Sequence, residues 1–144
     1  MTFNQAVTIC LRLKYASFSD RAPRSEYWWF GFAVLLYSIM VIVVFFAVNA
    51  VSGGFSKVSG LSSFGLLTLI FCGIGYVALI LPSIAVTLRR FHDVNLSGWW
   101  VLASFLIGAM PLVGWLASIA VLVVTLLKGS AGQNRFGPDP LIQP

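Results

Sequence analysis

The sequence predicts an all-α integral membrane protein with four transmembrane segments, preceded by a short N-terminal interfacial helix. Of its 144 residues, 59% are hydrophobic and only 9% are charged, whereas about a quarter of a soluble domain is charged. Charged residues are absent from three long stretches, 27–56, 58–88 and 94–127. Each stretch exceeds the roughly 20 residues that a helix needs to cross a bilayer. We therefore expect a single membrane domain over residues 1–144.

Residues 1–22 are expected to form a cytoplasmic or interfacial segment. Apolar and polar residues mix between Thr2 and Phe18, which is typical of a short helix on the membrane surface, with Asn4 as its N-cap. The first membrane helix is predicted over residues 24–51. Its apolar run is longer than the roughly 7–15 residues of a signal-peptide core, so we expect an uncleaved anchor.

The second membrane helix is predicted over residues 61–88, after a short external loop that carries Lys57. Pro82 lies inside this helix, near its cytoplasmic end. Because proline lacks an amide donor and clashes with the preceding turn, it predicts a kink.

The last apolar run is too long for one straight crossing, and it is interrupted at Pro111. We predict a short helical hairpin of residues 98–110 and 112–128, which returns the tail, residues 129–144, to the cytoplasm. Eight of the nine basic residues then lie inside, as the positive-inside rule expects. The alternative has three spans, with a long, kinked third helix.

The net charge of +5 does not indicate a nucleic-acid partner, because the basic residues flank the membrane segments. In that position they indicate topology and contacts with anionic lipids. Cys10 and Cys72 show no metal-ligand spacing and are expected to be reduced packing residues. With one histidine in the chain, we expect neither a metal site nor a cofactor.

Three polar segments, residues 18–30, 89–100 and 129–140, fall on the predicted cytoplasmic side. They supply a candidate cluster that binds lipid headgroups or a partner, or that has a structural role: Arg21, Arg24, Glu26, Arg89, Arg90, His92, Asp93, Asn134, Arg135 and Asp139. They also supply an interfacial aromatic belt: Tyr27, Trp28, Trp29, Trp99 and Trp100. Such rings favour the headgroup level of a bilayer.

Charge balance predicts ion pairs within this cluster. Glu26 lies at the start of a membrane helix, where an unpaired carboxylate is costly, so Arg89 or Arg90 is expected to pair with it. For Asp93 the sequence leaves three partners open: Arg21, Arg24 and Arg135.

The motifs that carry a family resemblance are Glu26-Tyr27-Trp28, Arg89-Arg90-Phe91-His92-Asp93 with Ser97-Gly98-Trp99-Trp100, the break from Pro111 to Gly114, and Asn134-Arg135-Phe136-Gly137-Pro138-Asp139-Pro140. Together they resemble the bacterial inner-membrane family called domain of unknown function 805, the YhaH-type proteins. The resemblance covers residues 18–140 and implies a plasma-membrane location and a small multi-helix fold, but no activity. Two positions depart from the family pattern: Asp20 replaces a common glycine, and Leu96 replaces a common basic residue.

We interpret the chain as a membrane-embedded binding or scaffold module with a basic cytoplasmic face. Its expected partners are membrane lipids, a membrane or cytoplasmic protein, or a second copy of the chain. An oligomeric transporter or channel component for a small solute is the alternative. A membrane-bound enzyme is disfavoured, because no serine near His92 and Asp93 has the context of a nucleophile and no second histidine supports metal hydrolysis.

Overall fold

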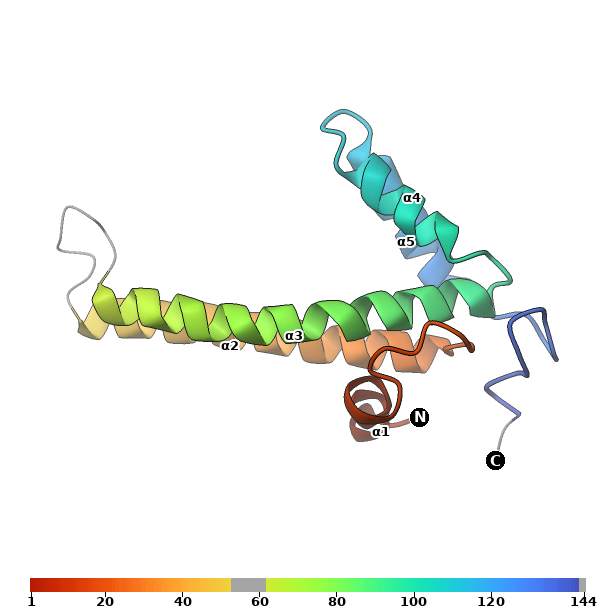
Figure 1. Cartoon of the computed structure of the whole chain (residues 1–144), viewed down its shortest axis with the longest axis horizontal. Coiled ribbons are helices and arrows are strands. Elements are labelled where there is room, and N and C mark those ends of the chain that lie inside the picture. Colours follow the sequence, from red (N-terminus) through yellow and green to blue (C-terminus); the bar gives the residue numbers. More distant parts are fainter. Residues whose placement is uncertain (53–61, 143–144) are drawn as a thin grey trace. The chain divides into compact units, whose positions relative to one another are not determined.

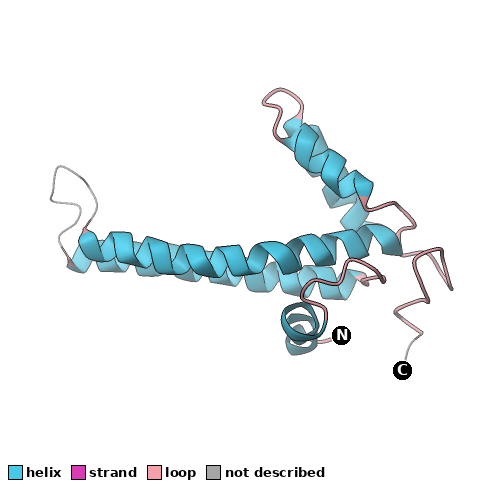
Figure 2. Cartoon of the chain, in the orientation of Figure 1, coloured by secondary structure: helices cyan, strands magenta, loops and turns pink. Residues whose placement is uncertain are grey.

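The computed structural model describes residues 1–52 and 62–142, and within these ranges the chain is helical, with no β-strand (Figures 1 and 2). The predicted all-α class is confirmed. Lys57 of the predicted external loop, the first residue of the predicted 61–88 helix and the last two residues of the tail lie outside the described residues.

Two long helices, α2 (Arg24–Val51) and α3 (Ser63–Asp93), are long and apolar enough to cross a membrane. Only 6% and 11% of their most apolar windows are buried inside the protein. Large side chains such as Val43 on α2 and Phe71 on α3 therefore face outward. Exposure of this much apolar surface is unfavourable in water and expected in lipid.

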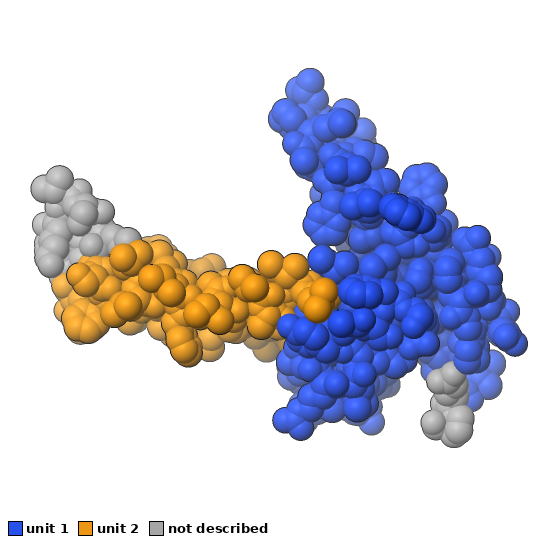
Figure 3. Space-filling view, viewed as in Figure 1, with its two compact units in different colours: residues 1–30, 82–144 blue, residues 31–81 orange. Residues whose placement is uncertain are grey.

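The chain divides into two compact units, and each long helix contributes to both (Figure 3). The described residues of the smaller unit, residues 31–81, form an antiparallel pair of α2 and α3, and several of their polar groups bond within the unit. The Tyr37 hydroxyl donates to the Cys72 carbonyl at 2.8 Å, and the fully buried Asn49 side chain accepts from the Ser62 amide at 3.2 Å. Such pairing is what a nonpolar solvent demands of polar groups.

The larger unit, residues 1–30 and 82–144, contains the remaining helices and the tail. At its N-terminus, α1 (Phe3–Thr8) is followed by a π-helix, η1 (Ile9–Leu13). The expected N-cap at Asn4 is wrong: Thr2 caps α1, and the Gln5 side chain completes a capping box. This reciprocal bonding satisfies two amides that an isolated Asn4 cap would leave open.

Helix α3 continues through Arg89–Asp93, beyond the predicted end at residue 88. It ends in a Schellman motif, in which the Leu96 amide donates to the Phe91 carbonyl and the Asn95 amide donates to the His92 carbonyl, both at 2.9 Å. Asn95 has a φ of 61°, a left-handed conformation that asparagine tolerates. The helix extends into the charged segment because those charges find partners, as described below.

The last apolar run forms two separate helices, α4 (Trp99–Gly108) and α5 (Gly114–Leu126), which pack against each other as a hairpin. The turn between them contains Pro111, the predicted breaking point. A side chain at Gly114 would collide with the Gly108 carbonyl, at 2.5 Å from its Cβ, so the turn requires glycine there. With 10 and 13 residues, the helices are about 15 and 20 Å long, shorter than the roughly 30 Å hydrocarbon core.

Candidate functional site

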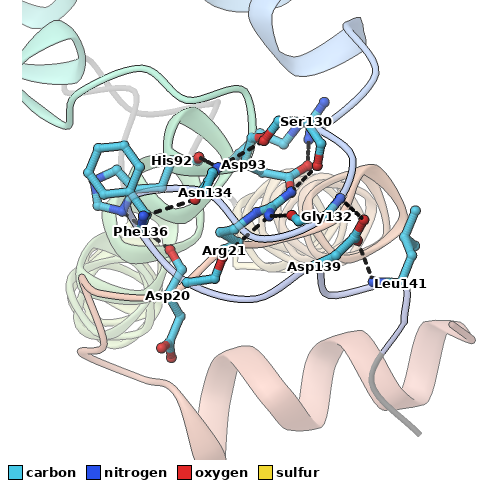
Figure 4. Close-up of polar contacts among 12 residues, drawn as sticks. Asp20, Arg21, His92, Asp93, Ser130, Gly132, Asn134, Phe136, Asp139 and Leu141 are labelled. Carbon is cyan, nitrogen blue, oxygen red and sulfur yellow. Dashed lines mark hydrogen bonds and ion pairs between the residues drawn. The ribbon is translucent and has the colours of Figure 1, made fainter.

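The three polar segments identified in the sequence meet inside the larger unit (Figure 4). Two backbone hydrogen bonds join them directly. The Ala22 amide donates to the Arg89 carbonyl at 3.0 Å, and the Ser130 amide donates to the Asp93 carbonyl at 2.8 Å. The chain before α2, the end of α3 and the C-terminal tail are thus held together before any side chain is considered.

Asp93 lies between two arginines at the centre of this meeting point. Its Oδ1 accepts from Arg21, with Oδ1–Nε and Oδ1–Nη2 distances of 3.0 and 2.9 Å, and its Oδ2 accepts from Arg90 Nη1. The three side chains are at most 5% exposed. Burial of charges is tolerated only when they are paired and hydrogen-bonded, and the Asp93 carboxylate serves both guanidinium groups.

Arg21 also binds the tail through backbone carbonyls. Its Nη1 donates to Gly132 at 2.6 Å and to Gly137 at 3.4 Å, and its Nη2 donates to Ser130. In Figure 4 the tail loops around this guanidinium. Because guanidinium carries five donors in a rigid fork, one side chain can hold several tail residues at once.

A second buried ion pair joins Arg89 to Glu26, with a distance of 2.5 Å between Nη1 and Oε1. The two side chains are 0% and 4% exposed. The Cys10 thiol from η1 donates to the same carboxylate oxygen at 3.7 Å, and burial followed by the Glu26 charge raises the pKa of this thiol to about 12. Arg89 Nε is buried and has no hydrogen-bond partner among the described residues.

Arginines from α2 and α3 cap the C-terminal carbonyls of α5. Arg90 donates through Nε to Thr125 at 3.3 Å and through Nη2 to Leu127, and Arg24 Nη1 donates to Leu126 at 3.2 Å. The last turn of a helix leaves such carbonyls unpaired and carries partial negative charge. Guanidinium groups satisfy both requirements and hold the end of α5 beside the start of α2.

His92 packs under the tail rather than facing solvent. Its ring stacks on Phe136 with centroids 4.0 Å apart and an interplanar angle of 6°, and its Nδ1 lies 3.3 Å from the Asp20 carbonyl. The Asn134 side chain donates to the His92 carbonyl at 2.9 Å. Figure 4 shows these groups on one side of the Arg21–Asp93 pair.

Asp139 organises the tail itself. Its carboxylate accepts from the Leu141 amide at 2.9 Å and from the Gly132 amide at 3.0 Å. The Leu141 bond has the largest effect on the pKa of Asp139 and lowers it. Burial opposes this effect, and the Gly132 bond and the Arg21 charge add to the lowering, so the pKa lies below its ordinary value. The tail is thus a loop closed by its own carboxylate and held by Arg21.

All residues of the predicted polar cluster lie in the larger unit, but they differ in how exposed their side chains are. Six are buried: Arg21, Glu26, Arg89, Arg90, His92 and Asp93. Asn134 and Asp139 are half-buried, whereas Arg24 and Arg135 are exposed. Glu26 pairs with Arg89, one of its two predicted partners. Asp93 pairs with Arg21, one of its three, and also with Arg90, which was not among them.

The sequence interpretation missed Cys10 and the carbonyls that accept from Arg21 and Arg90. A signal for Cys10 existed: Ala6 and Cys10 are small residues four apart in a short amphipathic segment, and both are fully buried. The carbonyl acceptors cannot be predicted from side-chain types, because every residue carries a backbone carbonyl. Of the predicted aromatic belt, Tyr27 is half-buried and the four tryptophans are exposed, so their rings are available to a surrounding lipid.

The arrangement neutralises charge and ties segments together. Three buried guanidinium groups face two carboxylates, and backbone carbonyls of the tail and of α5 supply the remaining negative potential. Within residues 1–52 and 62–142, no group of three or more histidine, cysteine or acidic side chains is placed to hold a metal ion.

Comparison with known proteins gives the chain its family. The family described as "Protein of unknown function (DUF805)" matches residues 15–138. Inner membrane protein YhaH of Escherichia coli (strain K12) is 38% identical over 133 residues, which cover 90% of this chain and 92% of the relative. Inner membrane protein YhaI of the same strain is 34% identical over 126 residues, covering 88% and 87%. No solved structure matches the chain. The chain therefore belongs to the DUF805 family, whose similar members in Escherichia coli are named inner membrane proteins.

Proposed function

We propose that the protein is a multi-pass inner-membrane scaffold whose two terminal segments are locked together on the cytoplasmic side of the membrane. The observation that supports this proposal is the Arg21–Asp93 pair with its tail carbonyls. It joins the segment before α2, the end of α3 and the tail, so all three share one side of the bilayer. By the positive-inside rule, the basic residues around them favour the cytoplasmic side.

This arrangement supports a count of four membrane segments. Because α5 ends on Arg24 and Arg90, the α4–α5 hairpin starts and finishes on the side where α2 begins. The hairpin is short, so a full crossing would require local thinning of the bilayer at a modest cost per ångström.

Two reporter fusions and one cysteine test this topology. A fusion after Pro144 should report from the cytoplasm and a fusion at Lys57 from the periplasm. In a background with Cys10 and Cys72 replaced by alanine, Leu112→Cys at the hairpin tip, where the native side chain is 85% exposed, should react with an impermeant maleimide added from the periplasm. If the fusion after Pro144 reports from the periplasm, the scaffold proposal is overturned. If Pro144 reports from the cytoplasm and the cysteine at position 112 does not react, a re-entrant hairpin replaces the third and fourth crossings.

The binding surface of this scaffold is its exposed basic residues and not the whole predicted cluster. Arg21, Arg89 and Arg90 are buried and engaged internally, so no ligand reaches them without unfolding. Exposed basic side chains remain at Arg12, Arg24, Lys128 and Arg135. Beside an anionic membrane, each such residue contributes about 1 kcal/mol to lipid attraction.

We propose no catalytic role for the adjacent His92 and Asp93. The Asp93 carboxylate accepts from two guanidinium groups, which removes it from any role in orienting the histidine as a base. We expect His92→Ala to weaken the packing of the tail and to abolish no enzymatic turnover. Loss of a measurable turnover in a folded His92→Ala protein would contradict this.

A further inference from the structure

A groove of about 620 Å³ runs between the end of α3 and the α4–α5 hairpin, within the larger unit. Its lining is mostly apolar and includes Val101, Phe105, Ala117 and Val121. The groove belongs to the part of the chain that the proposed function immerses in lipid. In that setting an unfilled groove forfeits the dispersion contacts of its lining atoms.

Hydroxyl groups also line the groove, and three of them direct their protons to the protein's own backbone. Thr87 donates to the Ser83 carbonyl at 2.7 Å, Ser104 to the Val101 carbonyl at 2.7 Å and Ser118 to the Gly114 carbonyl at 3.4 Å. The surface left to a ligand is therefore largely hydrocarbon. It suits an alkyl chain better than a polar solute, which needs unused donors.

Two basic residues, Arg24 and Lys128, lie at the ends of helices that contribute to the walls of the groove. Arg24 is one helical turn before Tyr27, which lines the groove, so the two side chains share a face of α2. Arg24 also donates to Leu126, at the end of the helix whose Ala117 and Val121 form another wall. Lys128 follows two residues later, and both cations are exposed.

We propose that the groove holds one acyl chain of an anionic phospholipid whose phosphate binds Arg24, with Lys128 selecting for net negative headgroups. An arginine beside a phosphate forms charge-assisted, bidentate hydrogen bonds. This inference deepens the proposed lipid contact and rests on it, but it adds a defined stoichiometry and a defined place for the lipid tail. Headgroup charge sets the choice of lipid, and the groove sets how long it stays.

Gly108 offers a way to fill the groove without disturbing its walls. It lines the groove, and a side chain added there meets no atom within 4 Å. Gly31 provides the matched control, because it is also an exposed helical glycine with open space around its Cβ, but it lies outside the groove. Ser104→Phe fills the same groove one turn away, in case Gly108→Phe fails to fold.

Native mass spectrometry of the full chain in detergent, with equal phosphatidylglycerol and phosphatidylcholine, tests the proposal. Wild-type protein should retain one phosphatidylglycerol. Gly108→Phe or Ser104→Phe should lower that retention at least fivefold, Gly31→Phe should not, and Lys128→Gln should remove the preference over phosphatidylcholine. Thermal melts in the same detergent confirm that each variant is folded.

The contrary outcomes separate the groove from the basic surface. If the groove variants bind normally while Lys128→Gln loses the headgroup preference, the acyl-chain site is overturned and surface lipid binding stands. If wild-type protein shows no preference between the two lipids, both proposals fail. If Gly108→Phe converts a dimer into a monomer without changing bound lipid, the groove's occupant is a second copy of the chain and the lipid assignment is wrong.

Discussion

The guanidinium of Arg21 and the carboxylate of Asp93 form a buried ion pair with Nη2 and Oδ1 2.9 Å apart, although the residues are 72 positions apart in sequence. Arg90 donates to the second oxygen of the same carboxylate. Asp93 therefore compensates two cations, and the rest of the network depends on it more than on any single arginine.

Replacing Asp93 by asparagine should destabilise the protein by about 3–5 kcal/mol, because it leaves two buried guanidinium groups without a counter-charge. The measurement is unfolding in detergent followed by circular dichroism. Lys14→Ala is the control, since its ion pair with Asp20, at 3.1 Å, is largely solvent-exposed and should contribute less than about 1 kcal/mol. Equal losses for the two variants would show that the buried carboxylate has no special role.

The Arg89–Glu26 pair allows a sharper test of what a buried ion pair contributes. Glu26→Met alone should lower the unfolding free energy by about 3–5 kcal/mol, because it leaves the buried Arg89 without a counter-charge. Combining Glu26→Met with Arg89→Met should recover most of that loss. A double-mutant cycle on unfolding free energies measures the coupling. If the double variant is as unstable as the sum of the single ones, the two side chains stabilise the fold independently.

The partners of these acidic groups show what sequence can and cannot predict here. A carboxylate at the start of a membrane helix demands a cation, and Arg89 and Arg90 follow directly on the second predicted membrane helix, so Glu26 had a short list of partners. The helix break at Pro111 was equally predictable, because proline and its flanking glycines act on the local backbone.

The rest of the network could not be predicted from the sequence, for a physical reason. The acceptors of Arg21 and Arg90 are carbonyls of Ser130, Gly132, Thr125 and Leu127, and every residue type offers a carbonyl. The end of α3 was misplaced for a related reason: a run of charges normally ends a membrane helix, but here the charges are neutralised by partners distant in sequence.

Asp20 has a φ of 69°, in the left-handed region that glycine adopts without strain. Asp20→Ala should therefore cost about 1–2 kcal/mol relative to Asp20→Gly. Both substitutions remove the Lys14 ion pair, so the difference between them isolates the backbone. Thermal melts of the two variants measure it, and indistinguishable stabilities would mean that the loop relaxes around residue 20.

Cys10 should be nearly inert toward alkylation in the folded protein. Its pKa is raised from an ordinary 9.0 to about 12, so at pH 8 the thiolate fraction falls roughly 10³-fold relative to the unfolded chain. Maleimide labelling in a Cys72→Ala background, with and without denaturant, measures the ratio. Because the folded-state pKa is the higher one, the thiol's contribution to stability is complete below pH 9 and is lost as pH rises toward 12. Rapid labelling of native protein would contradict the buried contact with Glu26.

Asp139 gives the tail an acid-sensitive closure. Hydrogen bonds from Leu141 and Gly132 lower its pKa below the ordinary 3.8, so the carboxylate stabilises the docked tail above that value, and this contribution disappears as pH falls through the folded-state pKa. Hydrogen exchange at the two amides should be slow at neutral pH and should lose protection, beyond the intrinsic pH dependence of exchange, only under strongly acidic conditions. Asp139→Asn, which cannot ionise, should show weaker protection at neutral pH and no such transition. A tail that opens near neutral pH in both proteins would assign the closure to another group, and His92 beneath Phe136 would be the next residue to replace.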